Sequence, residues 1–249
     1  MIRIILGNVG GGKTALVIRE MALNENNRLT YTNIKTELPT TKLINHKMII
    51  KREIVDYKKN KKTGDQNPIY KSELNVDFWK NIKEPINVVL DEAHSIMNSR
   101  RSMSKINVIL TDWLALIRRI LGEQEGSYGT LTFITQLPNR IDIIAREMAT
   151  NVTYCVMHYK RTCTNCNSSW QEHSELPETT NKCYVCHSTK LKRSNFTVEV
   201  WEFTNMNKFL MWSHSKTKSF FKHYYVKDIQ KYFNYYDTLQ WENLFNEVY

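Results

Sequence analysis

Residues 1–14 read Met-Ile-Arg-Ile-Ile-Leu-Gly-Asn-Val-Gly-Gly-Gly-Lys-Thr. The apolar run Ile2–Leu6 predicts a buried strand, and the glycines behind it predict a tight loop that opens a helix near Gly12. Backbone N–H groups of such a loop can point at a polyphosphate, and the positive end of the helix dipole adds to the attraction. The residues predicted to bind phosphate are Gly7, Asn8, Val9, Gly10, Gly11, Gly12, Lys13 and Thr14.

Two side chains of this loop have their own chemical reasons. Lys13 is placed to neutralise the β and γ phosphates of a nucleoside triphosphate, and the Thr14 hydroxyl is a suitable ligand for a bridging magnesium ion. The alternative is a glycine-rich turn that precedes a helix by chance. The order strand, loop, helix favours the nucleotide site.

Composition places limits on the rest of the molecule. The 249 residues, 41% of them hydrophobic, suffice for one α/β domain with an appendage. No apolar stretch reaches about 18 residues and no signal peptide is apparent, so we expect a soluble, cytoplasmic protein without a membrane span, in the host cytoplasm if it is viral. The net charge of +10 favours a polyanionic partner such as nucleic acid.

The basic residues are densest between Lys51 and Lys62. They flank a predicted turn at Thr63-Gly64-Asp65, which indicates a hairpin tip that carries cations. Such a tip is either a solvated loop or a contact for a phosphate backbone. The cations are Lys51, Arg52, Lys58, Lys59, Lys61 and Lys62.

Strand and helix patterns alternate along the first 157 residues. Alternation of this kind predicts an α/β fold with a mostly parallel sheet and helices on both faces. The expected strands after the first are Leu29–Ile34, Met48–Val55, Ile86–Leu90, Leu131–Thr135 and Val152–Met157. The expected helices are Lys13–Leu23, Ile106–Leu121 and Ile141–Met148.

Two of these strands end in polar residues. Asp91 follows the run Ile86–Leu90 and is predicted to hold magnesium, whereas Glu92 is predicted to activate the attacking water. Gln136, at the end of another strand, can contact the γ-phosphate and the water if its strand lies beside the first. The alternatives are an acidic helix cap for the pair and an ordinary surface position for the glutamine. His94 is interpreted as a bystander.

Together these motifs resemble the FtsK and HerA branch of P-loop ATPases, and within it the zonular occludens toxin-like proteins and related viral ATPases. The resemblance covers residues 1–155. It implies a RecA-like P-loop NTPase fold, ATP and Mg²⁺ as ligands, and the roles already given to Lys13, Thr14, Asp91, Glu92 and Gln136. The matching residues are Gly7–Thr14, Asp91-Glu92, Thr135-Gln136 and Asp142 with Arg146.

The resemblance also implies a ring-shaped homo-oligomer, such as a hexamer, in which an arginine of one subunit completes the site of its neighbour. Arg118 and Arg119 are the first candidates, because a guanidinium suits the spread charge of the phosphoryl transition state. The other candidates are Arg100, Arg101, Arg140 and Arg146. Toxin-like members that export phage usually carry a membrane span, and its absence here favours a motor that packages a viral genome.

Four cysteines form a second motif. Cys163 and Cys166, and Cys183 and Cys186, are two Cys-x-x-Cys turns separated by sixteen residues, which is typical of a structural zinc site. Two disulfides and an iron–sulfur cluster are the alternatives. Cys155 is interpreted as a buried apolar residue. The division that follows is an ATPase core at 1–159, a zinc ribbon at 160–193, and a returning strand with an aromatic helical segment at 194–249.

Aromatic residues crowd the last thirty positions. Ile229, Tyr232, Phe233 and Tyr236 share a helical face, which favours core packing over a subunit interface or base stacking. The sequence as a whole predicts an ATP-hydrolysing motor that moves nucleic acid, in the first instance double-stranded DNA, with a viral capsid or assembly protein as a further partner. A nucleotide-switched assembly or secretion factor that acts on protein is the main alternative, followed by a small-molecule phosphotransferase.

Overall fold

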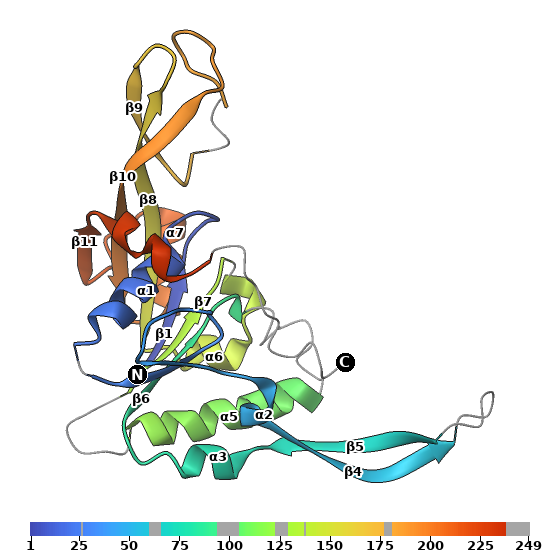
Figure 1. Ribbon diagram of the computed structural model, residues 1–249. Helices are drawn as coiled ribbons and strands as arrows, with labels where there is room; N and C mark the ends of the chain where they lie inside the picture. The colour runs from blue at the N-terminus through green and yellow to red at the C-terminus, as the bar shows by residue number, and fades with distance from the viewer. Residues whose placement is uncertain are drawn as a thin grey trace.

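The computed structural model describes residues 1–25, 27–59, 66–93, 105–122, 129–136, 138–176 and 181–237 (Figure 1). The described elements, in chain order, are β1 (Ile2–Leu6), α1 (Lys13–Leu23), β2 (Leu29–Thr32), β3 (Thr41–Leu43), α2 (His46–Ile49), β4 (Ile50–Lys59), β5 (Gln66–Leu74), α3 (Val76–Lys80), β6 (Ile86–Leu90), α5 (Lys105–Gly122), β7 (Leu131–Ile134), the 3-10 helix η2 (Pro138–Arg140), α6 (Ile143–Glu147), β8 (Asn151–Cys163), β9 (Ser169–His173), β10 (Leu191–Phe203), α7 (Met206–Ser215), β11 (Lys222–Val226) and the 3-10 helix η3 (Ile229–Tyr235).

The main sheet has the strand order β11-β10-β8-β1-β7-β6-β2-β3. The six strands from β8 to β3 run parallel to their neighbours, as the alternation of strands and helices predicts. Strands β10 and β11 extend the sheet in antiparallel fashion, and β9 pairs with the outer part of β8. The fold is therefore mixed α/β with a mostly parallel sheet, and its antiparallel edge is the part that the sequence did not predict.

Successive side chains of a strand point to opposite sides of the sheet. In this sheet both sides are packed, each against its own hydrophobic core. On β1, Ile4 packs into a core with helix α5, whereas Ile5 packs into a second core with helix α1. Both isoleucines are fully buried. Strand β1 is thus enclosed on both sides, and the loop that follows it emerges at the carboxyl edge of the sheet (Figure 1).

The predicted strand Met48–Val55 does not belong to the main sheet. Strand β4 pairs only with β5 in a two-stranded antiparallel sheet that projects from the body of the molecule (Figure 1). Its apolar residues beyond the buried Ile50 are exposed, with Ile54 at 50% and Val55 at 56% of their full accessibility. The hairpin itself agrees with the sequence, whereas its turn at Thr63-Gly64-Asp65 lies outside the described residues.

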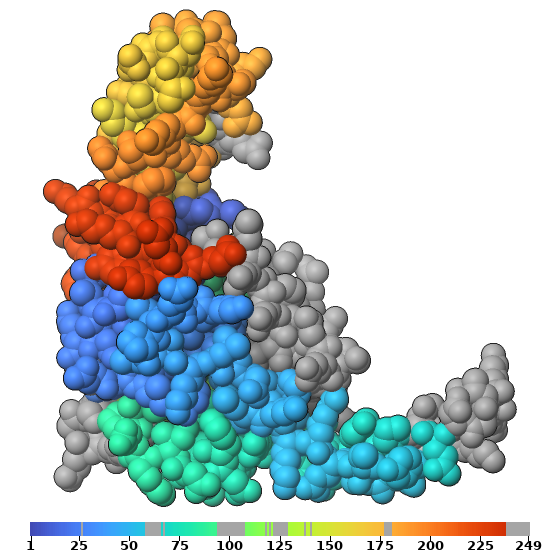
Figure 2. All heavy atoms as spheres, in the orientation of Figure 1, coloured from blue at the N-terminus to red at the C-terminus, as the bar shows by residue number. Residues whose placement is uncertain are grey.

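Strands β8 and β10 are longer than the apolar pattern predicts, and together with β9 they form a second projection (Figures 1 and 2). Strand β8 continues without interruption from the sheet to Cys163. The residues of β11 and η3, red in Figure 2, lie between this projection and the body. Ile229 in η3 is fully buried, and Tyr232, Phe233 and Tyr236 pack against the α1 core, as the helical pattern predicts.

None of the helices within the described ranges is both long enough and apolar enough to cross a membrane.

Candidate functional site

The loop between β1 and α1 has a conformation that only glycine accommodates. Gly10 and Gly12 have φ angles of 71° and 85°, in the left-handed region that disfavours other residues. A Cβ atom on Gly7 would lie 2.5 Å from the carbonyl oxygen of Cys155 on β8. The glycines therefore let the loop curl tightly over the ends of β1 and β8, with α1 beginning at Lys13.

Lys13 is folded beneath this loop. Its side chain is 8% exposed, and Nζ donates hydrogen bonds to the carbonyl oxygens of Gly7 at 2.9 Å and Asn8 at 2.8 Å. Burial lowers the pKa of Lys13 from its ordinary value, while the nearby carboxylate of Asp91 opposes that effect. An ammonium held in this position is ready to exchange loop carbonyls for phosphate oxygens.

Thr14 meets Asp91 across the sheet. The Thr14 hydroxyl donates a hydrogen bond of 2.8 Å to Oδ2 of Asp91, which follows the last residue of β6. Burial raises the pKa of Asp91, and the hydrogen bonds from Thr14 and from the Glu92 amide oppose the rise. A hydroxyl and a carboxylate are hard oxygen ligands of the kind that Mg²⁺ takes beside phosphates, so this pair could hold that ion.

Asn33 is a site residue that the sequence did not reveal. Its Nδ2 donates to the carbonyl oxygen of Asp91 at 2.9 Å, and its Oδ1 accepts from the Asp91 amide at 2.7 Å. The pair of bonds fixes the backbone at the point where β6 ends. Asn33 follows β2, the neighbour of β6, and this placement at the carboxyl end of a parallel strand is the only signal that could have indicated it.

Glu92 and Gln136 are joined in the same way. Strand β7 lies between β1 and β6, so Gln136 emerges beside the phosphate-binding loop. Its Nε2 donates to Oε1 of Glu92 at 3.2 Å. Glu92 itself has a φ of 49°, an uncommon value for a residue other than glycine, and this backbone turn directs its side chain toward Gln136.

These residues line one cavity of about 1270 Å³. Its lining includes the loop Gly10–Thr14 and the polar group of Asn33, Asp91, Glu92 and Gln136. The two motifs that lie 77 residues apart in the sequence are therefore brought together, as the motif pattern predicts. The arrangement can bind a polyphosphate along the loop and present two carboxylates to its terminal phosphate.

Of the predicted arginines, those whose side chains the structure describes do not line this cavity. Helix α5 ends at the opposite edge of the sheet, where the Leu121 carbonyl accepts from the Gly129 amide and the Gly129 carbonyl accepts from the amino terminus of Met1. Arg119 is exposed near that end. Arg100, Arg101 and His94 lie outside the described residues, as do the side chains of Arg118 and Arg140. Arg146 is half-buried on α6, which Asp142 caps through the Ile144 amide.

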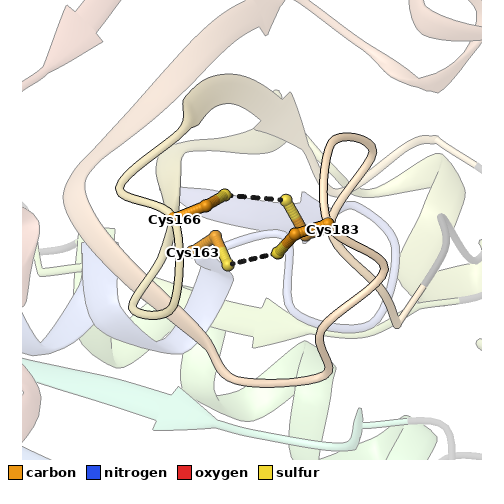
Figure 3. Close-up of side chains that lie close together, drawn as sticks. Cys163, Cys166 and Cys183 are labelled. Carbon is orange, nitrogen blue, oxygen red and sulfur yellow. Dashed lines mark hydrogen bonds between the residues drawn. The ribbon is translucent and has the colours of Figure 1, made fainter.

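The four predicted cysteines converge at the tip of the β8–β10 projection (Figure 3). All four Sγ atoms lie within 4.8 Å of one another, and two pairs, Cys163 with Cys186 and Cys166 with Cys183, are 3.6 Å apart. A disulfide requires about 2.05 Å, so these cysteines are not bonded to each other. Tetrahedral zinc with Zn–S distances of about 2.3 Å has Sγ–Sγ edges of about 3.8 Å, close to the 3.6 Å of these two pairs.

Local hydrogen bonds prepare one thiol for metal binding. The Ser168 hydroxyl lies 3.1 Å from Sγ of Cys183, and the Val185 amide donates to the same sulfur at 3.4 Å. The Ser168 contact and the backbone amides lower the pKa of Cys183 to about 6. The thiolate is the form that coordinates metals. In contrast, burial raises the pKa of Cys155 to about 12, which agrees with an inert apolar position.

The chain resembles proteins of known structure. No curated protein matches the chain. The N-terminal domain of zonular occludens toxin from Neisseria meningitidis is similar in structure at 19% identity, with a TM-score of 0.47 over 95% of this chain and 98% of that one. The genome packaging NTPase B204 from Sulfolobus turreted icosahedral virus 2, in complex with ATP-gammaS, is similar at 11% identity, with a TM-score of 0.35 over 61% of this chain and 74% of that one.

A family profile gives the classification. The profile described as Zonular occludens toxin (Zot) matches residues 1–199 of the 249. That range contains the phosphate-binding loop, the residues from Asn33 to Gln136 that meet it, and all four clustered cysteines. The chain therefore belongs to the zonular occludens toxin (Zot) family.

Proposed function

We propose that this chain is a magnesium-dependent ATPase that drives the movement of nucleic acid. The observation that carries the proposal is the hydrogen bond between Thr14 and Asp91, with the Glu92–Gln136 pair lining the same cavity. If the glycine-rich turn had arisen by chance, there would be no reason for two acids from the middle of the sheet to lie beside it. Family membership and the RecA-like strand order, with β7 between β1 and β6, also support it.

Each residue then has a defined task. The amides of the loop and Lys13 bind the phosphate tail. Thr14 and Asp91 would hold Mg²⁺, which would supply charge neutralisation for the phosphates. Glu92 accepts a proton from the attacking water as general base. Gln136 holds Glu92 in position and, through its contact with both water and γ-phosphate, responds to the state of the nucleotide. Asn33 holds the Asp91 backbone in position through two hydrogen bonds.

We propose further that the motor is a ring-shaped homo-oligomer, such as a hexamer, that packages viral DNA or transfers DNA, with a capsid or assembly protein as its docking partner. The net charge of +10 supports an anionic polymer. The position of Arg119, exposed and at the far edge of the sheet from its own loop, supports a role for it or Arg118 in the site of a neighbouring subunit rather than in its own.

The alternative, a nucleotide-switched factor that acts on protein, has one observation in its favour. The β4–β5 hairpin exposes apolar side chains, and its cations Lys51 and Lys71 are paired with Glu53 and Glu73. Such a surface suits a protein better than a phosphate backbone. The exposed apolar residues are Ile54, Val55, Tyr57, Ile69 and Tyr70.

ATP turnover in the presence of DNA separates the two functions. For a DNA motor we expect double-stranded DNA to raise the ATPase rate several-fold, and the stimulation to fall steeply between about 50 and 200 mM salt as counterions compete for the phosphates. A rate that is indifferent to DNA at low salt would contradict the motor and favour the protein-directed alternative. Heparin of matched charge serves as the control for non-specific polyanion binding.

The cysteine cluster supports a structural role for zinc. Four thiolates leave no open coordination position, so the metal would hold the tip of the projection together without taking part in hydrolysis. We propose that residues 160–193 form a zinc ribbon that grows out of β8 and β10, between an ATPase core at 1–159 and a segment at 194–249 that completes that core. Zinc at this point compensates for the small apolar core of so short a module.

A further inference from the structure

The cavity around the phosphate-binding loop has a second end that the hydrolytic residues do not use. Strands β8 and β10 lie on the side of β1 away from β6, the strand that Asp91 follows, and residues of both strands line the cavity. Aromatic rings and one arginine are prominent among them. The lining residues on these strands are Met157, Tyr159, Arg193 and Phe196, and η3 with the residues after it adds Phe233, Asn234, Tyr235, Tyr236 and Asp237.

The wall that carries these residues lies against the loop itself. A Cβ atom on Gly12 would meet Val198 at 2.6 Å and Met157 at 2.8 Å. Met157 and Tyr159 are two residues apart on β8 and so share one face of the strand. The wall that carries the rings therefore begins immediately beside the point where α1 opens.

An irregularity in β10 completes the wall. The pairing of β10 with β8 shifts between Ser194 and Thr197, and Asn195 has a φ of 54°. On a regular strand, Arg193 and Phe196 would point to opposite faces because they are three residues apart. The bulge places both in the same cavity, and bulges of this kind are over-represented beside active sites, where they redirect a side chain.

The rings of Tyr159, Phe196 and Phe233 form an aromatic shelf, and the Arg193 guanidinium contacts it. The Phe196 ring lies 5.9 Å from Tyr159 and 5.3 Å from Phe233, and the Arg193 guanidinium lies 4.6 Å above the Tyr159 ring. Phe196 and Phe233 are only half-buried, and Arg193 is exposed. A flat ligand can therefore lie against the half-buried aromatic faces, beside the exposed Arg193 guanidinium.

We propose that this aromatic end, formed by Tyr159, Phe196 and Phe233 with Arg193, holds the base of the nucleoside triphosphate. The inference rests on the proposed ATPase function and adds what that function lacked, a place for the base. The γ-phosphate must face Glu92 and Gln136, so the opposite end of the nucleotide must extend toward the rings. Base stacking on aromatic and guanidinium planes is sequence-tolerant and strong.

The test compares ATP with inorganic tripolyphosphate, which has the phosphates but no base. Binding to the full chain is measured by calorimetry with Mg²⁺. Phe196→Leu and Arg193→Ala are expected to weaken ATP binding roughly tenfold, the loss that a stacking contact supplies, and to leave tripolyphosphate binding unchanged. Lys192→Ala, the adjacent exposed cation on β10, and Phe221→Leu, an exposed ring outside the cavity, are the matched controls with no expected change.

The outcomes separate this inference from the function on which it rests. Equal weakening of both ligands, or no change in ATP affinity in either variant, would overturn the base site while leaving the ATPase intact. If the unmodified chain binds neither ligand, the ATPase proposal fails and the base site fails with it. Retained tripolyphosphate binding also reports that each variant has folded.

Discussion

Hydrogen bonds between residues from distant parts of the sequence hold the acidic groups of the site in position. Asp91 is held by Thr14 through its carboxylate and by Asn33 through its backbone, while Glu92 is held by Gln136. Ligand binding therefore need not pay for ordering these groups, which is how preorganised charge becomes useful in phosphoryl transfer. The cost of this arrangement is a buried carboxylate.

Replacement of that carboxylate should stabilise the free protein. Because burial raises the pKa of Asp91, its ionised form destabilises the folded state at pH values above the unfolded pKa of about 3.9. Asp91→Asn is expected to raise the melting temperature at pH 7 by roughly 2–4 °C and to abolish Mg²⁺-dependent turnover. Scanning calorimetry without nucleotide checks the first effect.

The sign of the pH dependence makes this prediction specific. As the pH falls through the folded-state pKa, Asp91 takes up a proton and its destabilising effect disappears, so the gap between variant and unmodified chain should close. A gap that widens on acidification would contradict the reasoning. Asp142→Asn is the control, because asparagine caps helix α6 as well as aspartate does.

Asn33 should act as a positioning residue. Asn33→Ala removes both hydrogen bonds to the Asp91 backbone, and at about 0.5–1.5 kcal/mol each it should lower the free energy of unfolding by about 1–3 kcal/mol. Turnover should fall about tenfold or more, since the Asp91 backbone is no longer held in position. Denaturant unfolding and steady-state ATPase assays measure the two effects.

Asn87→Ala supplies the matched control. Asn87 accepts hydrogen bonds from the Thr130 amide at 3.1 Å and hydroxyl at 3.0 Å, at the start of β6 and thus at the opposite edge of the sheet. We expect a similar loss of stability with normal turnover. Equal loss of turnover in both asparagine variants would show that general destabilisation, rather than the position of Asp91, limits the reaction.

Some of these residues could be read from the sequence and others could not. The spacing of Gly7–Thr14 and the acids after a buried strand have a chemical meaning that survives without a structure. Asn33 has none, because an asparagine after a short strand is ordinary until β2 is known to lie beside β6. The residues of the aromatic shelf could not be predicted from the sequence for the same reason, since their convergence depends on a bulge and on pairing between distant strands.

Among the elements, prediction succeeded where a strand is buried on both faces or a helix is strongly amphipathic. Strand β6 has the predicted bounds, and α5 differs from its prediction by one residue at each end. For β4 it was incomplete: the strand was predicted, but its alternating pattern fits a sheet edge and a free hairpin equally well. Strands β8 and β10 are longer than their apolar patterns predict. Their outer halves pair with each other and with β9, and they are not packed in a buried core.

The cysteine tip gives a prediction at this level. Protein produced with zinc should contain about one zinc per chain, and Cys166→Ser combined with Cys183→Ser should reduce it to near zero, because two thiolates cannot complete a tetrahedral site. Elemental mass spectrometry measures the metal. Amide exchange in the β8–β10 tip should accelerate in the variant while β1 and β7 stay protected.

Cys155→Ala provides the control for that experiment. Its thiol is fully buried and lies outside the cluster, so zinc content should not change. Iron with visible absorbance in place of zinc would favour the iron–sulfur alternative. A chain without bound metal and with unchanged exchange would contradict a structural metal altogether.

In the whole molecule, a nucleotide-sized cavity lies in a compact body from which two projections extend, the β4–β5 hairpin and the cysteine-bearing tip (Figure 1). Strands β8 and β10 connect the tip directly to the wall of the cavity. A nucleotide bound as proposed would therefore contact the same two strands that carry the tip.

The most direct measurement is ATP binding and turnover of the full chain beside its Glu92→Gln variant. Because glutamine keeps the shape but cannot accept the proton of the attacking water, we expect the variant to bind Mg²⁺ and ATP with unchanged affinity and to lose turnover by about a hundredfold or more. Lys13→Ala should lose binding itself. Unchanged turnover in Glu92→Gln, or no ATP binding by the unmodified chain, would contradict a hydrolytic site built from the loop and these two acids.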